Sequence, residues 1–592
     1  MIQYFREILY LLGDDKKKLP ILIVIFIGVS LLDLAGIGLI GPYVALVVSP
    51  DSLVKGRMHE VIKFLDLPLD QYTLLIQLGL LLVAVFLLKA VLAILINRTI
   101  LVFSNDQRIR LQSLLMHSYQ FLPYNNYLNR NSAEYIHAIR DSTNGFGTVL
   151  QTVLKTVSEG LVVLAIFVVL ALTNGTALIF LVLLLGGFIV GYDRFFRQKI
   201  HHYGEYANTA ATRMLQGIKE GIEGLKEIRI LSKEQHFHKI VKSNASESAQ
   251  YGIKSQLIST APRYLLEVLL VVFIVCLVVG TLLMGQDLRH LIPTLGVFGI
   301  AGLRLMPSAN ILSFSLTQLR FNRYPISQLY ADLNSLKESD LIESSFSDRP
   351  ESFETFQNLT VRKVSFSYPN IKFPAINDVS LQIHHGESIG LVGASGSGKT
   401  TLVDIILGLL DPYEGELFYN RKRLSSSLAE WRSQVAYLPQ EVFLIDNTLR
   451  HNVALGVDYN SIDDLRVQEA LEQACLLELV NQLPNKMNTL LGERGVRLSG
   501  GQRQRVALAR AFYHGRNVLV MDEATSALDN ETEKEIVNEI KQFKGKKTMI
   551  VIAHRLTTVQ YCDRIYRLEN GTIVEQGSYE EVIQKIKHVV AV

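Results

Sequence analysis

The 592-residue sequence predicts an all-α transmembrane domain of six helices fused to an α/β domain of the phosphate-loop type. Nearly all long apolar runs precede about position 335, whereas the remainder alternates short apolar strands, glycine-rich turns and charged helices. A complete phosphate-loop pattern stands in this second half. We therefore expect a membrane domain over 1–335, a linker over 336–356 and a nucleotide-binding domain over 357–592.

The composition excludes several other classes of protein. A formal net charge of +3 is close to balanced, so nothing indicates nucleic-acid binding, which normally uses a strongly basic face. Three scattered cysteines are too few for a disulfide framework or a zinc site. Because Lys16, Lys17 and Lys18 follow the first apolar residues, residues 1–20 do not resemble a signal peptide. They predict an amphipathic helix on the membrane surface, and a solvent-capped helix stays open.

Six apolar segments are candidate membrane spans. A helix needs about 20 apolar residues to cross a bilayer, and the third and fourth segments are short enough to need their flanking residues. A tight turn at Asn174 and Gly175 joins these two into a hairpin. The six segments are 21–48, 74–96, 157–172, 177–192, 264–284 and 291–312.

The charge of the connecting segments predicts the orientation. Residues 98–156 and 193–263 are rich in Arg and Lys, so the positive-inside bias places them, both termini and the second half in the cytoplasm. We expect a multi-pass protein of the cytoplasmic (inner) membrane. Segments 107–121 and 208–230 lack turn residues, which predicts that the helices continue beyond the bilayer. On the outer side, 51–72 predicts either a short surface helix or a structured loop.

Four charged residues, Asp33, Lys89, Glu267 and Arg304, lie in or beside the spans, where an unpaired charge is costly. Each is a candidate for lining a polar cavity. A position outside the hydrocarbon, or a structural ion pair, stays open for each of them. Arg304 is the strongest candidate for substrate contact, because the nearby Pro307 frees backbone groups and can bend the helix.

The phosphate loop lies between a predicted strand at 388–392 and a predicted helix at 399–410. Glycines allow backbone N–H groups to surround phosphates, and the helix N-terminus adds positive charge. Lys399 should neutralise the β- and γ-phosphates of ATP, and Thr400 should hold Mg²⁺. A simple tight turn is the alternative. The loop residues that we expect to bind nucleotide are Gly393, Ser395, Gly396, Ser397, Gly398, Lys399 and Thr400.

Three further predicted strands end at residues suited to phosphate chemistry. The strand 518–521 leads to Asp522, suited to Mg²⁺, and Glu523, suited as the general base that orients water. The strand 548–553 leads to His554, which could sense the γ-phosphate, and 435–438 precedes Gln440, a candidate contact for Mg²⁺ and water. A helix-capping acidic pair and an ordinary core histidine are the alternatives.

A second phosphate cradle is predicted at the start of another helix. Ser499, Gly500, Gly501 and Gln502 combine a capping serine with exposed glycine amides at a helix N-terminus. One chain does not need two cradles. We therefore expect this cradle to cover the γ-phosphate held by the phosphate loop of a second copy.

The ordered set resembles the ATP-binding-cassette family, and six spans ahead of one cassette resemble its exporter half-transporters. The resemblance implies an ATPase that uses ATP and Mg²⁺, acts as a homodimer and is coupled to transport across the membrane. It also implies an adenine contact, coupling turns at 123–129 and 233–237, and a loop at 492–495 that touches the membrane domain. The implied site residues are Tyr368 for adenine, 393–401 including Thr401 for the phosphates, Gln440, 498–502, Asp522, Glu523, 526–529 and His554.

More narrowly, residues 262–267 and 304–310 are similar to segments of bacterial flippases for lipid-linked oligosaccharides. This similarity implies a lipid-linked or amphipathic cargo whose pyrophosphate pairs with Arg304 or Arg263, with Lys89 and Glu267 as further candidates. A multidrug or peptide exporter stays open, and so does an ATP-gated channel or receptor. A soluble cassette ATPase is disfavoured by the six spans.

Overall fold

The computed structural model describes residues 2–48, 71–128, 130–173, 175–283, 291–338, 354–369, 371, 373–522, 541–552 and 558–582. The chain forms two compact units. The first contains 1–122 and 128–347; the second contains 348–592 and the short segment 123–127. The predicted linker, 336–356, lies largely outside the described residues, so its bounds stay a prediction.

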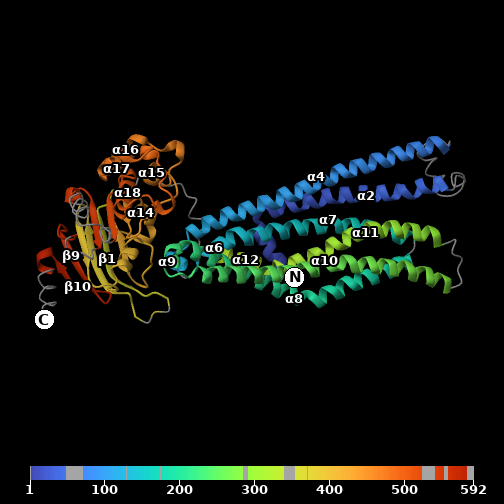
Figure 1. Cartoon of the computed structure of the whole chain (residues 1–592), viewed down its shortest axis with the longest axis horizontal. Helices are drawn as coiled ribbons and strands as arrows, with labels where there is room; N and C mark the ends of the chain where they lie inside the picture. The colour runs from blue at the N-terminus through green and yellow to red at the C-terminus, as the bar shows by residue number, and fades with distance from the viewer. Residues whose placement is uncertain are drawn as a thin grey trace. The chain divides into compact units, whose positions relative to one another are not determined.

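Long helices run side by side in the first unit (Figure 1). Each of the six predicted spans falls in a different long helix. Five of these helices are long and apolar enough to cross a membrane within the described residues, and the sixth predicted span lies in α11. The six are α2 (Leu19–Val48), α4 (Gln71–Gln120), α7 (Thr143–Thr173), α8 (Gly175–Glu223), α10 (Glu234–Leu283) and α11 (Leu291–Phe321).

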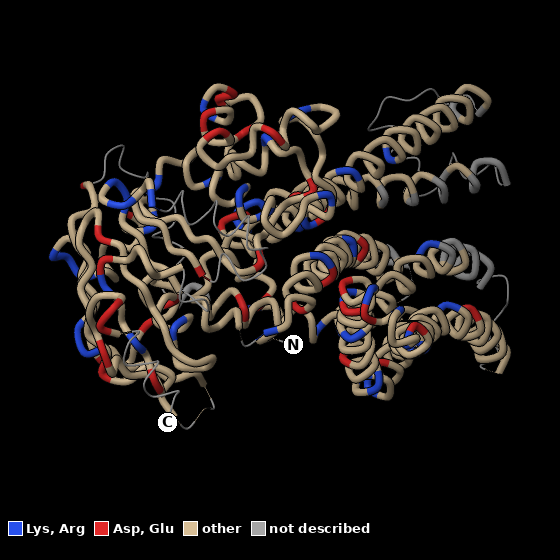
Figure 2. The backbone as a smooth tube through the Cα atoms, turned by 60° about the vertical axis from the view of Figure 1, so that its left-hand side comes forward, with Lys and Arg blue, Asp and Glu red and all other residues tan. Residues whose placement is uncertain are grey.

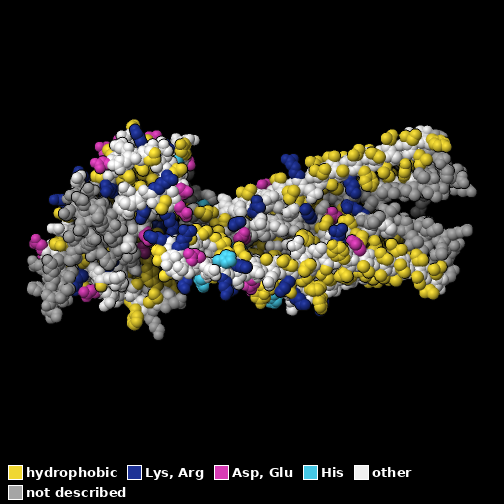
Figure 3. Space-filling view, in the orientation of Figure 1, with side chains coloured by type: hydrophobic (Ala, Val, Ile, Leu, Met, Phe, Trp, Pro, Cys, Tyr) yellow, Lys and Arg dark blue, Asp and Glu magenta, His cyan; other side chains and the backbone are white. Residues whose placement is uncertain are grey.

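The outer surfaces of these helices are apolar, which a water-soluble bundle could not tolerate. Leu80, Leu87 and Ile94 of α4 are each more than 60% exposed, as are Leu183 and Val190 of α8. Figure 2 shows long stretches of helix almost without charged residues, and Figure 3 shows hydrophobic side chains covering the same stretches. Exposed apolar area of this extent fits lipid and not water.

The predicted extension of the spans as helices is confirmed. Helix α4 continues through 107–120, and α8 continues to Glu223, where Gly224 separates it from α9 (Leu225–Ile230). Gly204 brings α8 against α11, because a Cβ at this position would lie 2.0 Å from the carbonyl oxygen of Phe321. Any side chain here would force the two helices apart.

Short elements complete the first unit. The predicted amphipathic helix is α1 (Ile2–Leu12), which buries Tyr4, Ile8 and Leu11 and exposes Ile2 and Phe5. The turn predicted at 123–129 contains the helix α5 (Tyr124–Leu128), of which all but Leu128 is grouped with the second unit. The other short elements are η1 (Gly13–Lys18), α6 (Ser132–His137), the π-helical η3 (Ala138–Ser142) and α12 (Arg323–Glu338).

The second unit contains two sheets. A four-stranded antiparallel sheet has the order β2-β1-β4-β5, and a six-stranded sheet has the order β10-β9-β3-β8-β7-β6. All neighbours in the larger sheet are parallel except the β10–β9 pair. The strands are β1 (Asn358–Phe366), β2 (Ile376–His384), β3 (Ser388–Val392), β4 (Glu414–Tyr419), β5 (Lys422–Arg423), β6 (Val435–Leu438), β7 (Val518–Asp522), β8 (Thr548–Ile552), β9 (Arg564–Glu569) and β10 (Thr572–Gly577).

Parallel pairing positions the functional loops at one edge of the larger sheet. Leu391 of β3 pairs with Ile552 of β8, and Ile552 also pairs with Asp522 of β7. The carboxyl ends of these strands therefore meet, as expected where an open α/β sheet binds its ligand. Strands β3, β7 and β8 are buried along their whole length, which agrees with their continuous apolar sequences.

Helices cover this sheet, and one predicted helix is shorter than expected. Helix α13 (Lys399–Ile406) was predicted to reach residue 410 but ends earlier, because Gly408 adopts a left-handed conformation at φ +65°. The remaining helical elements are η6 (Leu424–Ser426), α14 (Leu428–Gln434), α15 (Leu449–Val453), η7 (Tyr459–Ser461), α16 (Asp464–Gln473), α17 (Leu477–Gln482), η8 (Lys486–Asn488), η9 (Glu493–Gly495) and α18 (Gly500–Tyr513).

Candidate nucleotide-binding site

The phosphate loop connects β3 to α13, as the sequence predicts. Gly393, Gly396 and Gly398 all have positive φ angles, so the loop curls in a way that L-residues resist. A Cβ on Gly393 would lie 2.2 Å from the carbonyl oxygen of Leu568, and one on Gly398 would lie 2.6 Å from that of Ala375. The backbone is thus packed too closely for any larger residue at these two positions.

The side chain of Lys399 is buried within the phosphate loop. Its side chain is only 5% exposed, and Nζ donates to the carbonyl oxygens of Gly393 and Ala394, both at 2.9 Å. The buried hydroxyl of Ser397 has no hydrogen-bond partner within the described residues. A buried ammonium group and an unsatisfied hydroxyl beside backbone N–H groups fit the phosphates of a nucleotide. The exposed hydroxyl of Thr400 fits a Mg²⁺ ligand.

Two residues predicted to bind nucleotide are brought together from different elements. The Tyr368 hydroxyl lies 3.2 Å from the Thr401 hydroxyl on α13. The Tyr368 ring packs edge-on against Phe366, with ring centroids 5.1 Å apart. Tyr368 is therefore held beside the phosphate-loop helix, where an aromatic ring can meet an adenine base.

Asp522 ends β7 and is 7% exposed. Its Oδ2 accepts a hydrogen bond from the Tyr437 hydroxyl on β6 at 3.2 Å. Burial, and then the nearby Asp522, raise the pKa of Asp404 on α13 to about 6. Asp404 and Tyr437 were not selected from the sequence, although an aspartate within the otherwise apolar segment 402–407 is a signal that could have identified Asp404. Two close carboxyl groups beside the phosphate loop suit a cation such as Mg²⁺.

Replacing Asp404 with Asn should stabilise the nucleotide-free protein. Because folding raises the pKa of Asp404, the folded state binds the proton more tightly than the unfolded state between about pH 4 and 6, so its stability falls as the pH rises through this window. Above the window, Asp404→Asn should raise the free energy of unfolding by about 1–2 kcal/mol after allowance for solvent screening. Thermal unfolding at neutral and acidic pH measures this difference.

The gain from Asp404→Asn should disappear at acidic pH, where the native carboxyl is protonated. Asp458→Asn is a matched control, because Asp458 is exposed and lies in a separate loop. An equal gain at both pH values, or a loss of stability at neutral pH, would contradict the electrostatic explanation.

The second predicted cradle forms at the start of α18. The Ser499 hydroxyl accepts from the Gln502 N–H at 3.2 Å, and the Gln502 side chain accepts from the Ser499 N–H at 2.9 Å. This capping box satisfies two of the free amide groups at the helix end. Ser499 is exposed and Gly500 is half-buried, so this helix end can face an anion, whereas Gly501, which was predicted to be exposed, is buried.

Several predicted site residues cannot be placed in this geometry. Glu523, His554 and 526–529 lie outside the described residues. Gln440 is exposed two residues after β6, and its role stays a prediction. In the loop at 492–495, Gly492 and Arg494 both have positive φ angles.

The candidate cargo residues lie on three membrane helices. On α10, Arg263 and Glu267 form an exposed ion pair at 3.6 Å, so each partly neutralises the other. Lys89 on α4 lies over the Phe86 ring, 5.3 Å from its centroid. Arg304 on α11 is partly buried. The side chain of Asp33 is outside the described set.

A side-chain hydrogen bond links two of the predicted spans. Glu159 on α7 accepts a hydrogen bond from the Ser308 hydroxyl on α11 at 2.6 Å. Ser308 follows Arg304 by four residues, so both lie on the same face of α11. The sequence analysis missed Glu159, although an acidic residue inside the span 157–172 is itself a signal of function.

Two family models match the chain. Residues 22–298 match the ABC transporter transmembrane region, and residues 376–526 match the ABC transporter model. Together they cover more than half of the chain. The chain therefore belongs to the ATP-binding-cassette transporters, with a multi-pass transmembrane region and an ATP-binding domain in one polypeptide.

Two curated relatives and one solved structure are similar to this chain. The ATP-dependent lipid A-core flippase of Cupriavidus metallidurans is 44% identical over 230 residues, 38% of this chain and 39% of that protein. The protein of the same name from Saccharophagus degradans is 29% identical over 473 residues, 78% of each chain. The match therefore spans only about two fifths of the first relative. A bacterial Atm1-family ABC exporter solved with ATP bound shares the fold, with a TM-score of 0.76, 22% identity and 96% of both chains covered.

Proposed function

We propose that two copies of this chain form an ATP-driven flippase that moves a lipid-linked oligosaccharide or another glycolipid across the cytoplasmic membrane. The observation that carries the proposal is a complete phosphate loop, with Lys399 buried among its carbonyls, on the same chain as apolar helices that contain Arg304. Relatives named ATP-dependent lipid A-core flippases support a glycolipid cargo.

The nucleotide is expected to lie between two chains. Lys399 and the amides of the phosphate loop would bind the phosphates, Tyr368 would stack on adenine, and Thr400 and Asp522 would hold Mg²⁺, which withdraws charge from the reacting phosphate. The exposed Ser499 cradle of the second copy would close over the γ-phosphate. The exposure of Ser499 supports this composite site, because none of the residues that the structure describes covers its side chain.

Hydrolysis is assigned to the strand-end residues. Glu523 would accept the proton of the attacking water, with Gln440 and His554 ordering that water and the γ-phosphate. Closure of two cassettes on ATP and their release after hydrolysis would alternate the access of the membrane cavity. The cargo must bind the two states with different affinity for this cycle to give transport. Both termini and the cassette would face the cytoplasm.

Arg304 is proposed to bind the phosphate-bearing head group of the cargo. Bidentate guanidinium–phosphate pairing is strong in a site shielded from water, and the neighbouring Ser308 and Glu159 extend the polar strip. Arg304→Ala should reduce flipping of a labelled lipid-linked oligosaccharide in liposomes by about tenfold or more, with basal ATP hydrolysis changed less than about twofold. Flipping is measured as ATP-dependent accessibility of the label.

Arg98→Ala is the matched control, because Arg98 is an exposed arginine on α4 outside the proposed cargo set. Equal loss of flipping and ATP hydrolysis in Arg304→Ala would identify Arg304 as a structural residue. If the wild-type protein hydrolyses ATP but leaves the labelled lipid in place, the function becomes that of a multidrug or peptide exporter.

A further inference from the structure

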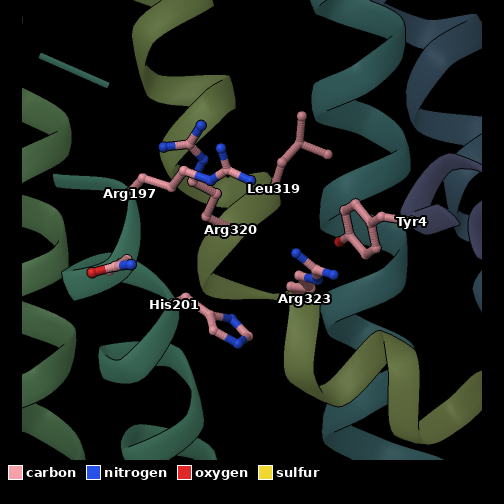
Figure 4. Close-up of a pocket in the computed structure, with 7 residues that line it drawn as sticks. Tyr4, Arg197, His201, Leu319, Arg320 and Arg323 are labelled. Carbon is pink, nitrogen blue, oxygen red and sulfur yellow. The ribbon is translucent and has the colours of Figure 1, made fainter. Parts of the chain in front are cut away.

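A basic pocket lies in the first unit, away from the proposed cargo residues. It has a volume of about 90 Å³ and brings together α1, α8 and the junction of α11 with α12 (Figure 4). A water molecule needs about 10–15 Å³ by this measure, so the pocket has room for several waters or one phosphate group. The residues of the basic pocket are Tyr4, Arg197, Gln198, His201, Leu319, Arg320 and Arg323.

Among the residues that the structure describes, one of the three pocket arginines, Arg320, forms an ion pair. Arg320 is buried and binds the carboxylate of Asp193 and, at 3.0 Å, its carbonyl oxygen. Over the described ranges of the chain, no carboxylate lies within ion-pairing distance of Arg197 or Arg323. Arg197 is exposed and Arg323 is half-buried, so both guanidinium groups can reach an anion that enters the cavity.

The nearby acidic groups have other partners. Glu7 on α1 is 7% exposed and accepts from the Ser327 hydroxyl at 2.7 Å. Glu205 on α8 lies 3.7 Å from His202. Asp193 binds Arg320, and Glu7 keeps its charge near Tyr4, so the three arginines of the pocket outnumber these two carboxylates.

Within the described residues, two buried polar atoms of the basic pocket have no hydrogen-bond partner. Tyr4 is 2% exposed, and its hydroxyl has no hydrogen-bond partner among the residues that the structure describes. The same holds for Nδ1 of His201. Figure 4 shows the Tyr4 hydroxyl directed toward the space that the arginines surround. A buried unsatisfied hydroxyl is costly, so its position in a cationic cavity indicates a ligand with oxygen acceptors.

The location of the pocket indicates where this ligand comes from. Helix α1, which supplies Tyr4, exposes Ile2, Phe5 and Leu9 on its other face; their exposed fractions are 89%, 42% and 44%. An amphipathic helix of this kind lies in the membrane–water interface, with its apolar face toward the lipid. The phosphates of lipid head groups lie at the same depth.

We propose that the basic pocket binds a phosphate group, supplied by an anionic lipid of the surrounding leaflet or by a soluble phosphate compound. Arg197 and Arg323 hold its charge, and Tyr4 and His201 complete its hydrogen bonds. The residues of the basic pocket include none of those assigned to the nucleotide or to the cargo, so the proposal does not depend on the identity of the cargo.

Native mass spectrometry of the detergent-purified full-length protein, titrated with phosphatidic acid or phosphatidylcholine, tests the proposal. The wild-type protein should prefer phosphatidic acid, and the double variant R197Q/R323Q should bind it about tenfold more weakly. Tyr4→Phe keeps the ring and should weaken binding about threefold, as expected for one lost hydrogen bond. Arg194→Gln is the matched control, because Arg194 is an exposed arginine of α8 outside the pocket.

A second arm separates the two sources of phosphate. Thermal unfolding with inorganic phosphate compares the wild type with R197Q/R323Q, whose nucleotide phosphate loop is unchanged, so any difference reports on the basic pocket. Stabilisation of the wild type alone, without a preference for phosphatidic acid, identifies a soluble phosphate compound as the ligand. Equal lipid affinities in the wild type, R197Q/R323Q and Tyr4→Phe, with equal responses to phosphate, overturn the proposal.

Discussion

Replacing Lys399 with Ala should weaken ATP binding and reduce ATP hydrolysis by about a hundredfold or more, because the variant loses the ammonium group that meets the β- and γ-phosphates. Lys399 is 5% exposed and is held by two carbonyl oxygens of the loop, each 2.9 Å from Nζ. When ATP binds, Nζ of Lys399 donates to charged phosphate oxygens instead of neutral carbonyl oxygens. The lysine therefore interacts more strongly with the bound nucleotide than with the empty loop. A hundredfold loss corresponds to about 2.7 kcal/mol of transition-state stabilisation.

Titration with a fluorescent ATP analogue measures the affinity, and phosphate release measures turnover. Lys546→Ala is a suitable control, since Lys546 is an exposed lysine of the same unit with its backbone in a turn. The wild-type loop should also unfold at a higher temperature with ATP than without, and the variant should show little of this shift. If Lys399→Ala binds ATP with the affinity of the wild type, the phosphate loop is not part of the nucleotide-binding site.

Replacing Glu523 with Gln should abolish hydrolysis while leaving ATP binding intact, a loss in turnover of at least about a hundredfold. The amide keeps the shape of the side chain but cannot accept the proton of the attacking water. ATP should then accumulate between two chains instead of being consumed. Chemical cross-linking of two copies should therefore rise with ATP in Glu523→Gln and only transiently in the wild type.

Glu472→Gln makes the same chemical change on an exposed face of α16 and should leave turnover unaltered. The double variant Lys399→Ala/Glu523→Gln should lose the ATP-dependent cross-link, since the trapped dimer needs bound nucleotide. If Glu523→Gln hydrolyses ATP as fast as the wild type, Glu523 is not the general base. Full turnover by a single chain in a nanodisc would exclude the composite site.

Much of the nucleotide site could be predicted from residue spacing in the sequence, because the phosphate loop and the start of α18 are each formed by a short continuous segment. The spacing of Gly393, Gly398 and Lys399 predicted a curled loop between a strand and a helix, and the structure has this loop with positive φ angles at the glycines. The serine and glutamine at 499 and 502 predicted a helix start, and both hydrogen bonds of the capping box are present. Apolar runs likewise located the membrane helices, since hydrocarbon imposes both length and composition.

Contacts between distant segments could not be obtained in this way. Asp404 and Asp522 are far apart in the sequence and become neighbours only because β3, β8 and β7 are paired in that order. The contact of Glu159 with Ser308 depends on the packing of α7 against α11. No local pattern specifies these neighbours.

The sequence by itself determined the class of each half, the phosphate loop, the start of α18 and the position of the long apolar helices, because periodicity, glycine placement and hydropathy act over a few turns or strands. Only the tertiary structure decided which charges are balanced. Within the described part of the chain, it pairs Arg320 with Asp193 and places Arg197 and Arg323 at a cavity that Tyr4 also lines. The physical reason is that the energy of a charge depends on what surrounds it in space, and those surroundings come from helices more than a hundred residues apart.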